Sequence, residues 1–151
     1  NTMLRIGHNL FVHAGLSARL LERDLEMDTL NARMSEGLYR TSKERREDPT
    51  LEFLYRSAGP VWYRGMVCAD EKYDPLTPEQ TDALLRRYDA DRLLVGHTIF
   101  PDISTFHDGR VIAVNVQNEL NRRKNRGRAV LIEGSRISVI GNRGVKRVLE
   151  E

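Results

Sequence analysis

Residues 10–17 read Leu-Phe-Val-His-Ala-Gly-Leu-Ser, an apolar run that ends abruptly at His13 and passes through small residues to Ser17. This pattern is typical of a buried strand that carries an imidazole at its C-terminal end and leads into a helix capped by the serine. Residues 93–98, Leu-Leu-Val-Gly-His-Thr, repeat the pattern with His97. The alternative is a core strand whose histidine is satisfied within a turn. If the two strands are neighbours, both rings lie at one sheet edge, where neutral imidazole is a common metal ligand.

Composition sets broad limits on the class of protein. The 151 residues are enough for one domain with its own core, and we take 1–151 as a single domain. Lys and Arg total 24 against 22 Asp and Glu, so net charge favours neither a nucleic-acid partner nor a membrane surface. No apolar run approaches the ~18 residues that a membrane-spanning helix needs. The single cysteine, Cys68, is typical of a reducing compartment such as the cytoplasm.

Hydrophobic periodicity and turn signals predict an α/β fold with a mixed sheet layered with helices. Helices are expected over 18–39 and 77–88, the second opened by a capping box, Thr-Pro-Glu-Gln. Hairpins are expected over 2–13, 103–116 and 129–140, and a buried strand over 92–96. The remaining segments are expected to be irregular: a polar surface segment at 41–48, a structured apolar loop at 51–55, a basic linker at 121–128 and an exposed tail at 141–151.

Residues 59–65 read Gly-Pro-Val-Trp-Tyr-Arg-Gly and place Arg64 beside two aromatic side chains. Aromatic neighbours can hold a guanidinium in place, and its planar fork matches two oxygens of a phosphate. The alternative is an arginine that stacks on Trp62 and only closes the loop. Residue types alone leave both interpretations open.

Other polar residues have simpler structural interpretations. His8 is expected to be solvated in a hairpin turn, and His107 with Asp108 to form the tip of another. The basic run 122–128 lacks the interleaved aromatic residues of a single-strand nucleic-acid site and is expected to be a solvated loop. Cys68 has no base near it in sequence and is expected to be buried rather than nucleophilic.

Four segments together resemble a known family. Residues 11–17 are similar to the FVHGGLS block of calcineurin-like metallophosphoesterases, in particular the PPP-type serine/threonine phosphatases. Residues 59–65 closely resemble the GPLWYRG block of the bacterial Shewanella-like phosphatases, a related branch. Residues 95–98 resemble the family's GHT block, and residues 108–115 the strand pair that follows it. Order and spacing agree over roughly residues 3 to 116.

The resemblance implies a four-layer α/β/β/α sandwich and hydrolysis of a phosphomonoester by two metal ions, usually manganese, iron or zinc. His13 and His97 would be ligands of the second metal. Arg64 would bind the phosphate oxygens as the catalytic arginine, with Tyr63 beside it in the substrate site. The expected substrate is a phosphorylated protein, at serine, threonine or tyrosine, or a small phosphoester.

The sequence also departs from that family. The Asp-x-His, Gly-Asp-x-x-Asp-Arg and Gly-Asn-His-Glu blocks, which in the family supply the first metal's ligands and the catalytic histidine, are not found. The expectation is therefore that the chain is the C-terminal half of such a domain, inactive without an N-terminal half as its partner. Two alternatives stay open: a dinucleoside polyphosphate hydrolase, and a non-catalytic phosphate-binding or interaction module.

Overall fold

The computed structural model describes residues 1–150, with the backbone alone for residues 145, 146 and 150. Its helical segments are η1 (Ala18–Arg23), α1 (Met27–Gly37), α2 (Ser42–Glu47), α3 (Pro49–Tyr55), η2 (Glu71–Tyr73), α4 (Pro78–Arg87) and α5 (Asn118–Arg123). Its strands are β1 (Met3–Ile6), β2 (Asn9–Val12), β3 (Arg92–Val95), β4 (Ser104–Phe106), β5 (Val111–Ala113), β6 (Ala129–Glu133), β7 (Arg136–Gly141) and β8 (Gly144–Glu150).

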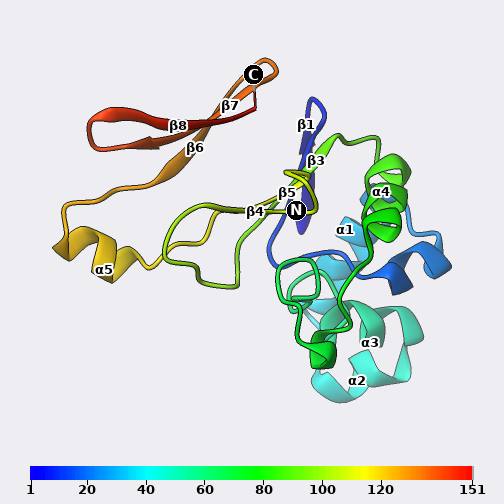
Figure 1. Ribbon diagram of the computed structural model, residues 1–151. Helices are drawn as coiled ribbons and strands as arrows, with labels where there is room; N and C mark the ends of the chain where they lie inside the picture. The colour runs from blue at the N-terminus through cyan, green and yellow to red at the C-terminus, as the bar shows by residue number, and fades with distance from the viewer. Residues whose placement is uncertain (151) are drawn as a thin grey trace.

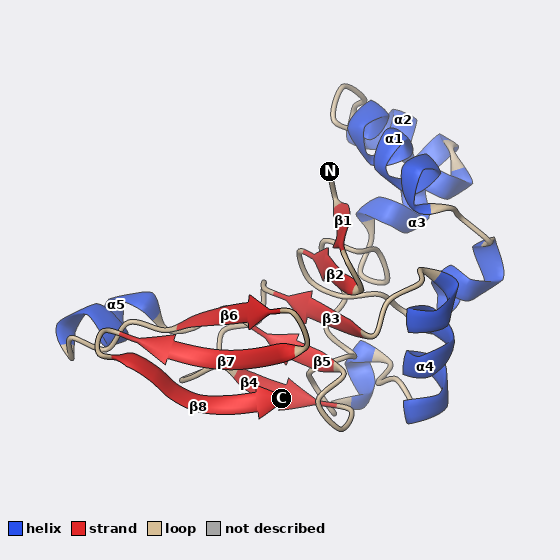
Figure 2. Ribbon diagram, turned by 90° about the horizontal axis from the view of Figure 1, so that it is seen from above, coloured by secondary structure: helices blue, strands red, loops and turns tan. Residues whose placement is uncertain are grey.

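A five-stranded mixed sheet forms the centre of the fold, in the order β1-β2-β3-β5-β4 (Figure 2). The three inner strands are parallel, and the two edge strands are antiparallel to their neighbours. Val12 of β2 lies opposite Val95 of β3, which in turn lies opposite Ala113 of β5. The C-terminal ends of the inner strands therefore reach one edge of the sheet together, as the sequence predicted for 10–13 and 93–97.

Alternate residues of the inner strands pack on opposite faces of this sheet. In β3, Leu93 and Val95 join a core with the helices, while Leu94 joins a second core with β7 and its neighbours. Figure 1 shows this arrangement, with α1, α3 and α4 on one side and the antiparallel sheet β6-β7-β8 on the other. Because both faces are covered, the inner strands read as continuous apolar runs.

The α/β class with a mixed sheet is confirmed, but the four-layer α/β/β/α sandwich is not. Among residues 1–150 the layers are helices, the five-stranded sheet and the three-stranded sheet, and we find no helical layer on the outer face of the last (Figures 1 and 2). None of the described helices is long and apolar enough to cross a bilayer.

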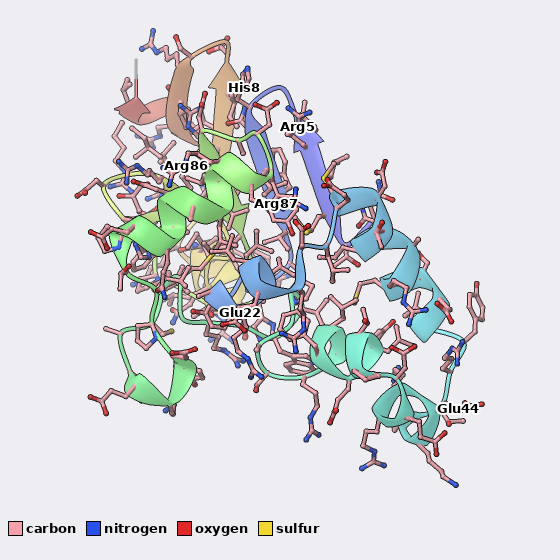
Figure 3. The ribbon with its side chains drawn as sticks, turned by 90° about the vertical axis from the view of Figure 1, so that its right-hand side faces the viewer. Arg5, His8, Glu22, Glu44, Arg86 and Arg87 are labelled. Carbon is pink, nitrogen blue, oxygen red and sulfur yellow. The ribbon has the colours of Figure 1, made fainter. Side chains whose placement is uncertain are left out.

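The predicted capping box of α4 is present. Thr77 Oγ1 accepts a hydrogen bond from Gln80 N at 3.2 Å, and Gln80 Oε1 accepts one from Thr77 N at 2.9 Å. Pro78 occupies the first turn, where no backbone donor is needed. Arg87, labelled on this helix in Figure 3, reaches Asp24 at 2.9 Å and so ties α4 to the end of η1.

The helix expected over 18–39 is two segments rather than one. Asp24 has a left-handed backbone, φ +46°, which ends η1 before α1 begins. Ser17 precedes η1 but its side chain does not cap it; Ser17 Oγ donates to Ala58 O at 2.8 Å instead. Apolar spacing alone did not reveal the break, because the buried residues on both sides of it face the same core.

Two helices occupy the region predicted to be irregular. Thr41 and Glu44 form a capping box that starts α2. Their spacing in the sequence is typical of a helix start, although the segment was predicted to be irregular. Asp48 Oδ1 accepts from Thr50 N and Leu51 N and starts α3, with Pro49 in its first turn. Pro49 therefore opens a helix rather than ending a surface segment, and the apolar cluster 51–55 is helical because its buried side packs on the core.

The C-terminal region is also more regular than expected. The first three residues of the basic linker, 121–123, belong to α5, and residues 144–150 of the expected tail form β8, which pairs with β7; residue 151 lies outside the described residues. The hairpins β1-β2, β4-β5 and β6-β7 are confirmed. At the tip of β4-β5, residues 107–109 all have positive φ, as a tight turn requires.

We expect that shortening a buried side chain of the central strand β3 destabilises the fold strongly. Leu93 is fully buried, so Leu93→Ala removes packing on the helical core and should lower the free energy of unfolding by about 2–5 kcal/mol. Leu38→Ala is the matched control, since Leu38 is 71% exposed and its loss should stay within about 0.5 kcal/mol. Equilibrium urea unfolding measures both, and equal losses would contradict the assigned core.

Candidate functional site

Two histidines meet at the C-terminal edge of the parallel strands. Gly96 N donates to His13 O at 2.9 Å, which continues the β2-β3 ladder by one residue past both strands. A Cβ atom on residue 96 would lie 3.2 Å from that carbonyl oxygen, so glycine permits the close approach. His13 Nε2 and His97 Nδ1 are then 3.1 Å apart, with ring centroids at 5.0 Å. The predicted convergence of the two imidazoles is therefore observed.

His97 is held in an unusual backbone turn. Its φ is +57°, and Thr98 N donates to Gly96 O at 2.6 Å across it. A three-residue turn with positive φ at its centre is a rare and strained conformation. The turn reverses the chain directly after β3, and the His97 ring consequently lies beside His13 rather than further along the strand direction.

The loop 59–68 is fastened against the His13 turn. Ala14 N donates to Pro60 O at 3.0 Å. Ser17 Oγ donates to Ala58 O, one residue before the loop begins, and so holds the start of the loop near the same turn. Tyr63 is buried, and its hydroxyl donates to Asp74 O at 2.5 Å. The polar end of Tyr63, predicted to contact substrate, thus bonds the backbone that follows η2. Burial raises the pKa of this phenol well above its ordinary value, so it remains a donor.

Trp62 contacts His97 from this loop, and Arg64 follows two residues later. The Trp62 ring lies edge-on to the His97 ring at 5.4 Å between centroids, and its side chain is half exposed. The Arg64 guanidinium carbon lies 5.6 Å from the centre of the Tyr73 ring. The aromatic contact of Arg64 is thus with Tyr73, rather than the stack on Trp62 weighed as an alternative. Its half-buried guanidinium still acts on His97 through its charge.

The pKa of His97 lies below its ordinary value. Burial is the main cause, and the positive charges of Arg64 and His13 add to it. The ring is therefore neutral near pH 7, with a lone pair available to a cation or a proton. His97 Nε2 is buried and has no hydrogen-bond partner among the described residues. A buried polar atom of this kind is costly unless something else satisfies it, such as a bound ligand or water.

His107 is a residue of the site's framework that the sequence did not identify. Its Nδ1 lies 3.2 Å from Thr81 Oγ1, and its Nε2 lies 3.0 Å from Met66 O. It joins the β4-β5 turn to α4 and to the loop that carries Arg64, so it does more than form a turn tip. The sequence contains no signal for this contact because its partners are 26 and 41 residues away.

The other candidate residues lie outside this cluster. His8 is exposed in the β1-β2 turn, as expected (Figure 3). Cys68 is half-buried and packs on the helical core. In the basic run, Arg126 donates to Asn121 Oδ1, and Arg128 donates to Asp102 at 2.8 Å. These two arginines therefore contact other residues of the fold. Over residues 1–150, no three His, Cys, Asp or Glu side chains gather as a metal cluster.

Comparison with solved structures identifies similar folds. The chain is similar to a cold-active protein tyrosine phosphatase, with TM-score 0.85 and 26% identity over 98% of this chain and 41% of that one. It is also similar to the cold-active protein-tyrosine phosphatase of a psychrophilic Shewanella species, with TM-score 0.86 and 27% identity over 99% of this chain and 43% of that one. No family model and no curated protein sequence matches.

These findings correct the family expected from the sequence. The matching structures are described as protein tyrosine phosphatases, whereas the resemblance predicted a calcineurin-like metallophosphoesterase of the PPP type. That assignment is not retained, and the interpretation of the chain as the C-terminal half of such an enzyme falls with it. The chain spans 41% to 43% of the length of these two neighbours.

Trp62 is the single tryptophan and offers a direct readout of His97. A protonated imidazole quenches an adjacent indole, so fluorescence should fall with a midpoint below pH 6.5. Since the folded state binds this proton less readily than the unfolded state, stability should decline as the pH falls below about 6.5.

Arg64→Gln should move that midpoint upward, because it removes one of the charges that lower the pKa. His97→Asn should abolish the transition, and His8→Asn, in the distant β1-β2 turn, should leave it unchanged. A midpoint at or above pH 6.5 in the unaltered protein would contradict the assigned environment of His97.

Proposed function

We propose that this chain carries the phosphate-binding site of a phosphatase that hydrolyses phosphomonoesters, with phosphotyrosine in a protein as the preferred substrate. The observation that carries the proposal is the pairing of His13 and His97 at the C-terminal edge of the parallel strands, where α/β folds commonly bind ligands, with the charge of Arg64 close enough to act on His97. The description of both neighbours as protein tyrosine phosphatases supports the reaction class and the substrate.

In this proposal Arg64 binds the phosphate oxygens. Arg64 is half-buried and carries no ion pair among the described residues, and its charge acts on His97. An unpaired planar fork of this kind can donate two parallel hydrogen bonds to a phosphate and can balance charge that develops on it. Tyr63 acts here by positioning the loop through its bond to Asp74 O. This bond holds the loop that carries Arg64 in place before substrate binds.

The two histidines also suit a shared metal ion. Two nitrogen ligands, each about 2.0–2.1 Å from a metal, lie roughly 2.9–3.4 Å apart in octahedral or tetrahedral geometry. The 3.1 Å between His13 Nε2 and His97 Nδ1, which are hydrogen-bonded in this structure, falls within that range, and the lowered pKa of His97 favours the neutral ring that a metal requires. Such an ion would supply Lewis-acid activation of water and phosphate. Iron or zinc suits imidazole donors, whereas manganese accepts them alongside oxygen ligands such as water or phosphate.

The chain's own residues account for the remaining requirements of the site. His13 and His97 hold the proposed ion from one side, and Arg64 orients the phosphate from the other. Trp62, half exposed beside His97, restricts water on the open side. Aromatic side chains along the adjoining loop suit a phenyl ring better than an aliphatic ester. The description of both neighbours as protein tyrosine phosphatases favours a phosphoprotein substrate over a dinucleoside polyphosphate.

Replacement of Arg64 should remove most of the activity. Arg64→Gln should lower kcat/KM for an aryl phosphate such as p-nitrophenyl phosphate on the order of 10²–10³-fold, because one set of phosphate donors is lost. Arg64→Lys should recover part of this loss by restoring the charge without the fork. Arg86→Gln on the exposed face of α4 is the control and should match wild type (Figure 3). No turnover by the unaltered protein with manganese, iron or zinc supplied would instead favour a non-catalytic phosphate-binding module.

Removal of one imidazole should weaken metal binding without unfolding the protein. In a Mn²⁺ titration followed by Trp62 fluorescence, His13→Asn should raise the apparent Kd for Mn²⁺ about 10–100-fold or more. His8→Asn should leave the curve unchanged, since His8 lies in the distant β1-β2 turn (Figure 3). Identical Mn²⁺ affinity in His13→Asn and wild type would refute the shared-ion geometry.

A further inference from the structure

A pocket opens directly beside the proposed phosphate site. It has a volume of about 890 Å³, within the range of sites that take sizeable ligands. Trp62, Tyr63 and Arg64 form the wall that it shares with the site. The rest of its wall comes from η1, the end of α3 and η2, contributing Arg19, Tyr55, Arg56, Ser57, Ala58, Lys72, Tyr73 and Asp74. Its volume exceeds what a phosphate group alone requires.

The charges around this pocket are mostly positive. Arg19, Arg56, Arg64 and Lys72 line it, against the single carboxylate of Asp74. Lys72 forms an ion pair with Asp70 at 2.7 Å, which raises the pKa of Lys72. Lys72 therefore already has an anionic partner. Among the described residues, neither Arg19 nor Arg56 forms an ion pair, although many other arginines do. The two arginines therefore remain available to an incoming anion.

The position of Arg56 follows from the local fold. It ends α3, where its backbone N–H donates to Phe53 O at 3.2 Å, and its side chain is exposed. Arg19 lies on η1, two residues after Ser17, which is bonded to Ala58 O. That bond brings the start of η1 against the segment that follows α3. Two cations distant in sequence are thereby placed on one wall of the pocket.

We infer that this pocket binds a second anionic group next to the phosphorylated residue, so that the favoured substrate is an acidic phosphopeptide. The inference rests on the proposed function, because the pocket adjoins the phosphate site through Arg64. An aryl ring would lie among the aromatic side chains of the shared wall, with its phosphate at Arg64. A neighbouring carboxylate or second phosphate would then reach Arg19 and Arg56. Positive charge on these exposed side chains also attracts such peptides from solution.

The test compares three phosphotyrosine peptides of equal length, with neutral residues, with Asp and Glu, or with a phosphoserine beside the phosphotyrosine. We expect kcat/KM to be at least about 10-fold higher for one or both of the anionic peptides, and the two arms identify the anion. Rising ionic strength should shrink this ratio, since exposed charges are screened.

Arg56→Gln and Arg19→Gln should each reduce the ratio of anionic to neutral peptide severalfold, mainly through KM. Arg86→Gln, which removes an exposed arginine outside the pocket, should keep the wild-type ratio. Equal kcat/KM for all three peptides, or an unchanged ratio in both pocket variants, would overturn the inference while leaving the phosphatase proposal standing. Absence of turnover for every peptide and for p-nitrophenyl phosphate would overturn the proposed function itself.

Discussion

The parallel pairing of β2 with β3 is the constraint on which the site depends. These strands are separated by about eighty residues of sequence, and their register places His13 level with Gly96. A shift of one residue would turn every side chain of a strand to the opposite face and would separate the two imidazoles. The buried alternation of Leu93, Leu94 and Val95 opposes such a shift, because both cores would then be mispacked. The geometry of the site is therefore fixed by apolar packing.

A second constraint holds the arginine loop on this frame. The loop bonds the His13 turn through Pro60 O and Ala58 O, and it bonds the segment after η2 through Tyr63. A Cβ atom on residue 65 would lie 2.2 Å from the Tyr63 hydroxyl, so the glycine after Arg64 is required by this packing. His107 holds the far end of the loop at Met66 O. Several independent bonds thus determine the backbone position of Arg64, as preorganised binding of the proposed phosphate would require.

The sequence predicted the placement of His13 and His97 better than the framework around them. Each histidine directly follows an apolar run, and such a run predicts a buried strand together with the residue at its C-terminal end. The convergence of His13 and His97 was therefore predictable. The Thr77 capping box was equally local and was confirmed. Asp24 and its left-handed turn were missed because the residues around it keep helical spacing across the break. His107 was missed because its function lies in contacts with residues far away in the chain. Resemblance of short blocks suggested a family and a four-layer architecture that the comparisons and the fold do not support.

The left-handed backbone at His97 has an evolutionary implication. A non-glycine residue in this conformation costs on the order of 1–2 kcal/mol, and glycine would relieve the cost. Glycine would also delete the nitrogen that faces His13. If the proposed site binds its ligand through His97, this position exchanges some stability of the fold for that binding, as strained residues at functional sites commonly do. Selection for heat tolerance alone would be expected to erode this position first, whereas selection on the site would preserve it.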